Sequence, residues 1–275
     1  MSYTVGLELE WADIDRHATI ESNLGTWNTK DYSIVNSDGH ANCPAGLTWR
    51  WGGEINTCWT HTSQVQSGIV DVLAKQLNPT INYKCNLHVH VRPDVDLIHD
   101  LSLLKRVAIY LKLSERFVYS TIEPIAKPTK EEFATEEEFK GAKKRYQRRR
   151  VSHQYSLPFA RWDEMMSATT PEKFLEAHAP PKWDGGRAWH IAPRPGMNMR
   201  SLWKHGTIEY RHFPGTADPV EIESAAEWCL RFTRAAVEGG PSPEEIYAQR
   251  EWKFPQFKPY DHKLQLGYEA TRHRS

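Results

Sequence analysis

The stretch that decides the fold is residues 3–11, YTVGLELEW, in which apolar and polar residues alternate strictly. One face of this stretch is apolar, and the other carries two carboxylates, those of Glu8 and Glu10. A period of two residues predicts a β-strand with one buried face. This strand would therefore place two acidic side chains together on the face that points away from the core.

Two later stretches repeat this pattern of an apolar face opposite paired polar side chains. In residues 84–92, KCNLHVHVR, the polar face carries His88 and His90, and in residues 207–213, TIEYRHF, it carries Glu209 and Arg211. Residues 47–57, LTWRWGGEINT, predict a further strand that includes Glu54. The runs MNMRSLW and TIEYRHF, joined by a short loop with a glycine, predict a hairpin.

Helical spacing of apolar residues separates these strands. We expect helices from Ser63, with Gln66 completing a capping box, over residues 97–120, after Pro171, and from Asp218 to Gly239. Strands scattered among helices, with a hairpin present, predict an α+β fold with a mainly antiparallel sheet.

The composition narrows the class of protein. The 275 residues include 35 basic and 35 acidic side chains, so the formal net charge is zero, which argues against broad electrostatic binding to nucleic acid or lipid. No apolar run approaches the ~18 residues that a membrane span needs. The start lacks the pattern of a secretory signal, and the four cysteines lack zinc-binding spacing. We therefore expect a cytoplasmic protein with reduced thiols and no membrane partner.

The polar pairs on the strands predict a ligand site. Placing Glu, His and Arg pairs on three strands is costly unless the charges meet a common ligand. Carboxylates with imidazole suit Mg²⁺ or Mn²⁺, and an arginine suits a phosphate. Each pair alone also has a plainer interpretation, namely a solvent-facing edge, a wet strand or a structural ion pair. Together they predict a metal–nucleotide site on one face of the sheet.

Four pieces of the chain, in this order, resemble the amidoligase family, whose members are related to glutamine synthetase and glutamate–cysteine ligase. The pieces are GLELE, then WNTKDYSI followed by GGEINT, then CNLHVHV, and last GTIEYRHFPGT. The resemblance runs from about residue 3 to about residue 237. It implies a curved, mainly antiparallel sheet of the glutamine synthetase-like carboxylate–amine ligase type, with helices on its outer face. It also implies a catalytic domain over residues 1–240, with a charged helical insertion at about 127–152, and a C-terminal extension over 241–275.

The resemblance further implies cofactors and residue roles. ATP and Mg²⁺ (or Mn²⁺) would be bound, and Arg211 would grip the transferring phosphoryl group. The implied metal ligands are Glu8, Glu10, Glu54, His88 and Glu209. The residues implied to bind ATP are His90, Arg211, Arg194 and Asn198. Those implied to take part in catalysis are Arg211, Glu209 and Glu54.

Three positions depart from the usual family pattern. Asn86 follows Cys85 where glycine is usual, Glu54 is followed by Asn56-Thr57 rather than the usual Val-Ser-Pro, and Tyr210 replaces phenylalanine. We expect none of these departures to touch a metal ligand, so that they would affect only the shape of the substrate pocket.

The implied reaction has two steps and forms an amide bond. A substrate carboxylate attacks the γ-phosphate of ATP to give an acyl phosphate, which an amine then attacks. The amine and carboxylate could belong to amino acids, polyamines, peptides or a macromolecule. The loop over 23–46 and the charged segment over 127–152 are candidate lids, because an acyl phosphate must be kept from water.

Two other functions fit parts of the sequence. A metal-dependent hydrolase could use His88, His90 and the carboxylates to activate water. A nucleic-acid-binding module could use KKRYQRRR, residues 143–150, although we favour a solvated helix end as the interpretation of that run.

Overall fold

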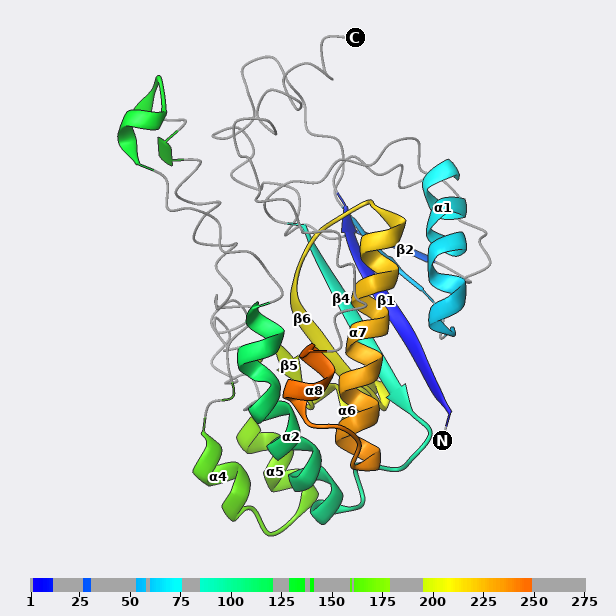
Figure 1. Cartoon of the computed structure of the whole chain (residues 1–275), viewed down its shortest axis with the longest axis vertical. Coiled ribbons are helices and arrows are strands. Elements are labelled where there is room, and N and C mark those ends of the chain that lie inside the picture. The colour runs from blue at the N-terminus through cyan, green and yellow to red at the C-terminus, as the bar shows by residue number, and fades with distance from the viewer. Residues whose placement is uncertain are drawn as a thin grey trace.

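An antiparallel sheet forms the centre of the protein in this computed structural model (Figure 1). Within the described residues, six strands lie in the order β2-β3-β1-β4-β6-β5, and they do not close into a barrel. The strands are β1 (Tyr3–Trp11), β2 (Trp27–Lys30), β3 (Gly53–Asn56), β4 (Asn86–Pro93), β5 (Met197–Asn198) and β6 (Ile208–Pro214). The structure describes residues 2–11, 27–30, 53–57, 60–75, 85–120, 129–136, 139–140, 159, 161–178 and 195–248. The predicted α+β class and antiparallel sheet are thus confirmed.

Three long helices cover one face of this sheet. They are α1 (Val65–Lys75), α2 (Leu101–Ser120) and α7 (Pro219–Glu238), and α7 lies across β1, β4 and β6 between the other two (Figure 1). The shorter helices are η1 (Thr62–Gln64), η2 (Lys130–Glu132), α4 (Trp162–Ser167), α5 (Pro171–His178), α6 (Ser201–His205) and α8 (Pro243–Ala248).

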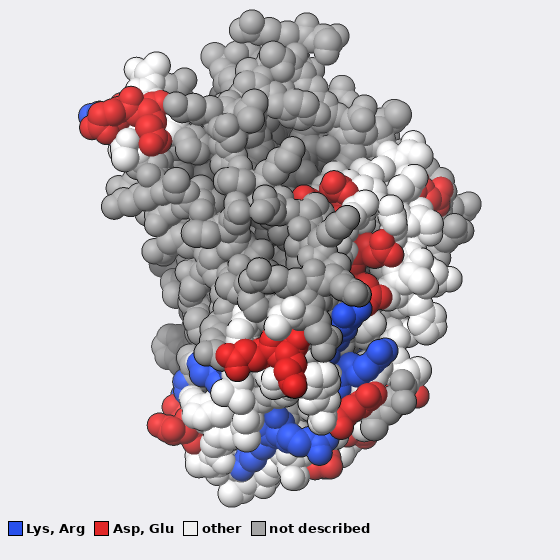
Figure 2. All heavy atoms as spheres, viewed as in Figure 1, with Lys and Arg blue, Asp and Glu red and all other residues white. Residues whose placement is uncertain are grey.

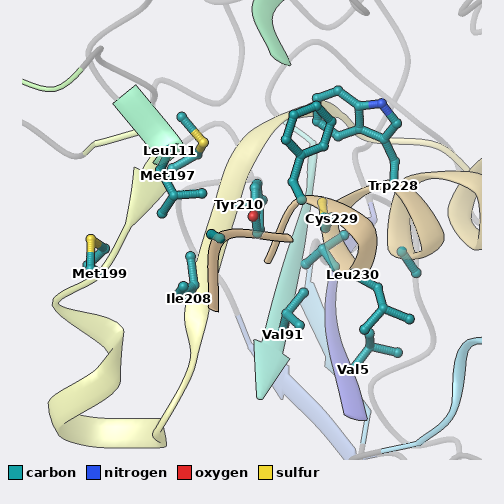
Figure 3. Packing of buried hydrophobic residues seen from close by; sticks show 14 of the residues in the cluster. Val5, Val91, Leu111, Met197, Met199, Ile208, Tyr210, Trp228, Cys229 and Leu230 are labelled. Carbon is teal, nitrogen blue, oxygen red and sulfur yellow. The ribbon is translucent and has the colours of Figure 1, made fainter. Parts of the chain in front are cut away.

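The apolar face of the three central strands packs against α7. Val5, Val91 and Tyr210 belong to the same buried cluster as Trp228, Cys229 and Leu230 of the helix (Figure 3). All apolar positions predicted to face the helices are at most 2% exposed: Val5, Leu7, Leu9, Leu87, Val89, Val91, Ile208 and Tyr210. The alternation in the sequence therefore predicts correctly which face of the sheet is buried.

The strand register brings the polar residues onto the other face. Glu8 pairs with His88 across β1 and β4, and His90 pairs with Glu209 across β4 and β6. Glu10 pairs with Glu54 across β1 and β3. Because side chains alternate between faces along each strand, these residues share a single face. The predicted common face is confirmed.

The ends of the long helices follow capping chemistry. The carboxylate of Asp218 accepts a hydrogen bond from the backbone N–H of Val220 (2.8 Å), and Gly239 ends α7 in the left-handed region at φ 77°. The predicted start of α2 at residue 97 is wrong, because Asp100 caps the helix by accepting from the backbone N–H of Leu103 at 2.9 Å.

Two local predictions are corrected by the structure. The predicted hairpin strand MNMRSLW is mostly absent: β5 has two residues, and α6 fills the space before β6, ending at Gly206 with φ 67°. The predicted capping box of Ser63 and Gln66 is also wrong. The chain there begins as the 3₁₀ turn η1, whose N-cap, His61, makes no side-chain capping bond.

Several sequence-based predictions lie outside the described residues. These are the strand residues 47–52, the basic run 143–150, most of both candidate lids, and Arg194. The division at residue 240 stays a prediction, although Ile246 of α8 is buried in the core and Tyr110 donates to the carbonyl of Pro241 at 2.6 Å. Cys85 and Cys229 are buried, as expected.

In the part of the chain that is described, no helix combines the length and the apolar character that crossing a bilayer requires.

One buried hydrogen bond joins the sheet to α7 and gives a test of this packing. The hydroxyls of Tyr210 and Thr233 lie 2.9 Å apart, and neither residue is exposed. Tyr210→Phe or Thr233→Val alone should lower the free energy of unfolding by about 1–3 kcal/mol, because each leaves the other hydroxyl buried without this partner. The double variant should lose less than the sum of the two. Chemical denaturation of all four proteins measures this, and strict additivity would contradict the coupling.

Candidate active site

Carboxylates and hydrogen-bond donors are intermixed on the polar face of the sheet. Residues that lie opposite one another on β4, β1 and β3 form rows across this face. One row consists of Asn86, Glu10 and Glu54, and the next consists of His88, Glu8 and Asn56. Each carboxylate thus has a donor beside it in its own row or one step along its own strand. This arrangement lets several acidic side chains share one partly buried surface.

Glu8 is held between the two imidazoles. Its Oε2 lies 2.7 Å from Nδ1 of His88, and its Oε1 lies 3.0 Å from Nε2 of His90. Burial alone would raise the pKa of Glu8, but the hydrogen bonds to both histidines outweigh it and lower the pKa well below its usual range. Burial and Arg211 act to lower the pKa of His88, but Glu8 and Glu10 raise it overall. Glu8 is therefore a fixed negative charge at the centre of the face.

Glu209 forms a second fixed negative charge, on β6. Its carboxylate accepts from Nη1 of Arg211 and, at 2.8 Å, from the side-chain amide of Asn198. Glu209 is 6% exposed and Arg211 is 9% exposed. Burial would raise the pKa of Glu209, but the guanidinium of Arg211 and the nearby histidines lower it.

Glu54 differs from these two carboxylates in its protonation. It lies directly across from Glu10 in the register of β1 and β3, so two like charges face each other. Burial, together with Glu8 and Glu10, raises the pKa of Glu54 to about 7, although the amide of Asn56 donates to its Oε1 at 2.9 Å and opposes the shift. Without a cation, Glu54 therefore titrates near neutral pH.

A metal ion fits the donor set of this face. Single ligand atoms of Glu8, His90 and Glu209 all lie within 4.8 Å of one another. His88 adjoins them, with Nε2 3.8 Å from Glu10 Oε1 and Nδ1 3.9 Å from Glu209 Oε1. Carboxylate oxygens with imidazole nitrogen suit Mg²⁺ or Mn²⁺. Which of the two imidazoles would bind a metal and which would face phosphates stays a prediction.

The structure thus brings together almost all of the residues predicted for the site. The eight that meet on the polar face are Glu8, Glu10, Glu54, His88, His90, Asn198, Glu209 and Arg211. Arg194 lies outside the described residues. Proximity is established for these eight, and their individual roles remain predictions.

Two buried hydroxyls behind His90 were missed by the sequence analysis. Thr207 Oγ1 lies 3.0 Å from Nδ1 of His90, and Ser201 Oγ lies 2.9 Å from Thr207 Oγ1. The ring of His205 also packs edge-on against His90, with ring centroids 5.7 Å apart. Thr207 could have been found, because it continues the polar period of Glu209 and Arg211. Ser201 could not, since its segment was assigned to a strand.

The expectation that the unusual residues avoid the site is wrong. The side-chain amide of Asn86 donates to Oε2 of Glu10 at 2.6 Å, and that of Asn56 donates to Glu54. Tyr210 agrees with the expectation, because it lies on the apolar face of β6. Two of the three departures from the family pattern therefore contact carboxylates of the site directly.

The helical side of the protein has a mixed charge. Figure 2 shows acidic and basic side chains interspersed over the described part of this side, below the grey region. The described residues on this side thus form no single broad basic surface, and the basic run 143–150 is not among them.

Comparison with known proteins gives one match to a family. A family model described as "Putative amidoligase enzyme" matches residues 2–233, which include every residue of the polar face discussed above. A search of curated proteins found no match.

The pKa of Glu54 gives a test of the charge arrangement in the metal-free protein. Because its pKa is raised in the folded protein, protonation of Glu54 stabilises the fold. This stabilisation is fully present below the ordinary pKa of 4.5 and is lost as the pH rises through about 7. Glu54→Gln should therefore gain stability relative to the unaltered protein between pH 5 and pH 8, by about 1–3 kcal/mol. Thermal unfolding with a chelator present measures this difference.

A matched control is Glu131→Gln, which makes the same chemical change at an exposed position on η2. Its stability difference should stay nearly constant over the same pH range. A constant difference for Glu54→Gln as well would contradict the crowding of carboxylates inferred here.

Proposed function

Because this chain belongs to the amidoligase family, we propose that it is an ATP-dependent ligase that joins a carboxylate to an amine. The observation that carries the proposal is the cluster of partly exposed Glu8 with buried His88, His90, Glu209 and Arg211 on one face of the sheet. An antiparallel sheet with helices on one side also supports a fold of the glutamine synthetase-like carboxylate–amine ligase type.

In this proposal the carboxylates hold divalent cations. The residues that would bind Mg²⁺ or Mn²⁺ are Glu8, Glu10, Glu54, His88 and Glu209, and the position of His90 supports adding it to the group. A bound cation would neutralise negative charge on the phosphates of ATP. The low pKa values of Glu8 and Glu209 support this role, because both side chains are then charged before any cation arrives.

Arg211 would act directly on the transferring phosphoryl group. Its guanidinium is buried, and Glu209 holds it in place. A planar, permanently charged fork suits phosphoryl oxygens better than an ammonium group does. Asn198 would help by fixing the other side of the same carboxylate, to which it donates at 2.8 Å.

The proposed chemistry balances in two steps. A substrate carboxylate oxygen attacks the γ-phosphorus, and the bond to ADP breaks with its electron pair leaving on ADP. The amine nitrogen then attacks the acyl carbon, the bond to phosphate breaks, and the nitrogen loses a proton to give the amide. Positioning and charge neutralisation account for most catalysis of this kind, and this agrees with the concentration of charged groups here.

The hydrolase alternative uses the same face without ATP. Family membership favours the ligase, and measured consumption of ATP separates the two. The amine and the carboxylate could each be carried by an amino acid, a polyamine, a peptide or a macromolecule.

Glu209→Gln should lower ATP-dependent amide formation by about 10²–10³ while the protein stays folded, because the amide keeps the shape but loses the charge. Arg211→Lys should also be damaging, since an ammonium lacks the two-point grip. Turnover across panels of carboxylates and amines, together with melting temperature on the same samples, measures both effects. Glu172→Gln, at an exposed position on α5, is the matched control.

Near-normal turnover of Glu209→Gln at saturating ATP and Mg²⁺ would contradict the ligase site. In that case Glu209 and Arg211 would form only a structural ion pair, and the variant would differ in melting temperature alone.

A further inference from the structure

Two asparagines hold carboxylates of the proposed cation site. Asn86 donates from β4 to Oε2 of Glu10 at 2.6 Å, and Asn56 donates from β3 to Oε1 of Glu54 at 2.9 Å. Glu10 and Glu54 face each other across the pairing of β1 and β3. Each member of this pair of like charges thus has one amide donor, across the sheet for Glu10 and along the same strand for Glu54.

The chemistry of these two donors matches that of the Asn198 amide but differs from that of the imidazole and guanidinium donors on the face. Glu8 and Glu209 are bonded to groups that are or can become cationic, namely His88, His90 and Arg211. A side-chain amide is a neutral donor. It can fix a carboxylate in one orientation without cancelling the negative charge that attracts a cation.

Each amide also occupies one oxygen of its carboxylate. With Oε2 of Glu10 bonded to Asn86, Oε1 is the oxygen nearer the centre of the face, 3.8 Å from Nε2 of His88. Asn56 engages Oε1 of Glu54 in the same way. Chelation of a cation by both oxygens of such a carboxylate would compete with this hydrogen bond, whereas ligation by the other oxygen alone would not.

We propose that Asn86 and Asn56 are positioning residues that restrict Glu10 and Glu54 to one-oxygen ligation, so that the site prefers Mg²⁺ or Mn²⁺ to Ca²⁺. Mg²⁺ requires compact octahedral coordination, whereas Ca²⁺ takes six to eight oxygens and often both oxygens of a carboxylate. Removing the amides frees the carboxylates to chelate the larger ion. This inference rests on the cation site of the proposed function and adds its selectivity.

The experiment measures cation binding by the full chain without any substrate. Mn²⁺ binding is followed by electron paramagnetic resonance, and Ca²⁺ and Mg²⁺ are titrated as competitors. The variants are Asn86→Ala, Asn56→Ala and the double change, with Asn86→Ser and Asn56→Ser retaining a short hydroxyl donor. Thr4→Val, on the same face of β1 but paired with Arg92, is the matched control.

We expect each alanine variant to bind Mn²⁺ about 10-fold more weakly or worse, as is usual when a partner that orients a metal ligand is lost. Ca²⁺ binding should change less, so that the preference for Mn²⁺ over Ca²⁺ falls. The serine variants should recover part of the preference for Mn²⁺. If an alanine variant fails to fold, the corresponding serine variant still tests the proposal. The control should bind both ions normally.

Unchanged Mn²⁺ affinity in the alanine variants, or an equal loss for Mn²⁺ and Ca²⁺, would overturn this inference and leave the proposed ligase site intact. A different result, in which the unaltered protein binds no Mn²⁺, would overturn the cation site itself together with the inference.

Discussion

The constraint on which this structure depends is the crowding of four carboxylates on one face of a sheet whose other face is buried at the described apolar positions of its central strands. Glu8, Glu10, Glu54 and Glu209 lie on neighbouring strands, and desolvation of such groups is costly unless each finds a donor. The protein meets this cost with imidazoles, one guanidinium and three side-chain amides. Glu54 is the least compensated, because burial first, and then repulsion from Glu8 and Glu10, raises its pKa to about 7.

The apolar face makes this crowding possible, because it fixes the strands in register. Val5, Val91 and Tyr210 pack against α7, and a slip of one residue in any strand would turn its valines or leucines toward the carboxylates. Packing of the apolar face thus stabilises a sheet on which like-charged carboxylates lie close together. Such an arrangement is typical of a surface that binds a cation and phosphates.

The sequence was sufficient to predict the shared face but not the contacts within it. Alternation in YTVGLELEW and CNLHVHV fixes which side chains lie on each side of a strand, and so places Glu8 and His88 together. The bond from Asn86 to Glu10 depends on which residues lie opposite each other on β1 and β4, which alternation does not determine. The short helix α6 was missed because SLWKH has no clear period, and it ends at a left-handed glycine.

The measurement that tests the central claim most directly follows oxygen from the substrate carboxylate. The protein is incubated with ATP, Mg²⁺, amines and a pool of amino acids labelled with ¹⁸O in their carboxyl groups, and the released phosphate is analysed by mass spectrometry. An ATP-dependent ligase that forms an acyl phosphate transfers one ¹⁸O atom to phosphate for each amide formed. Amide formation without label in the phosphate, or without consumption of ATP, would contradict this account.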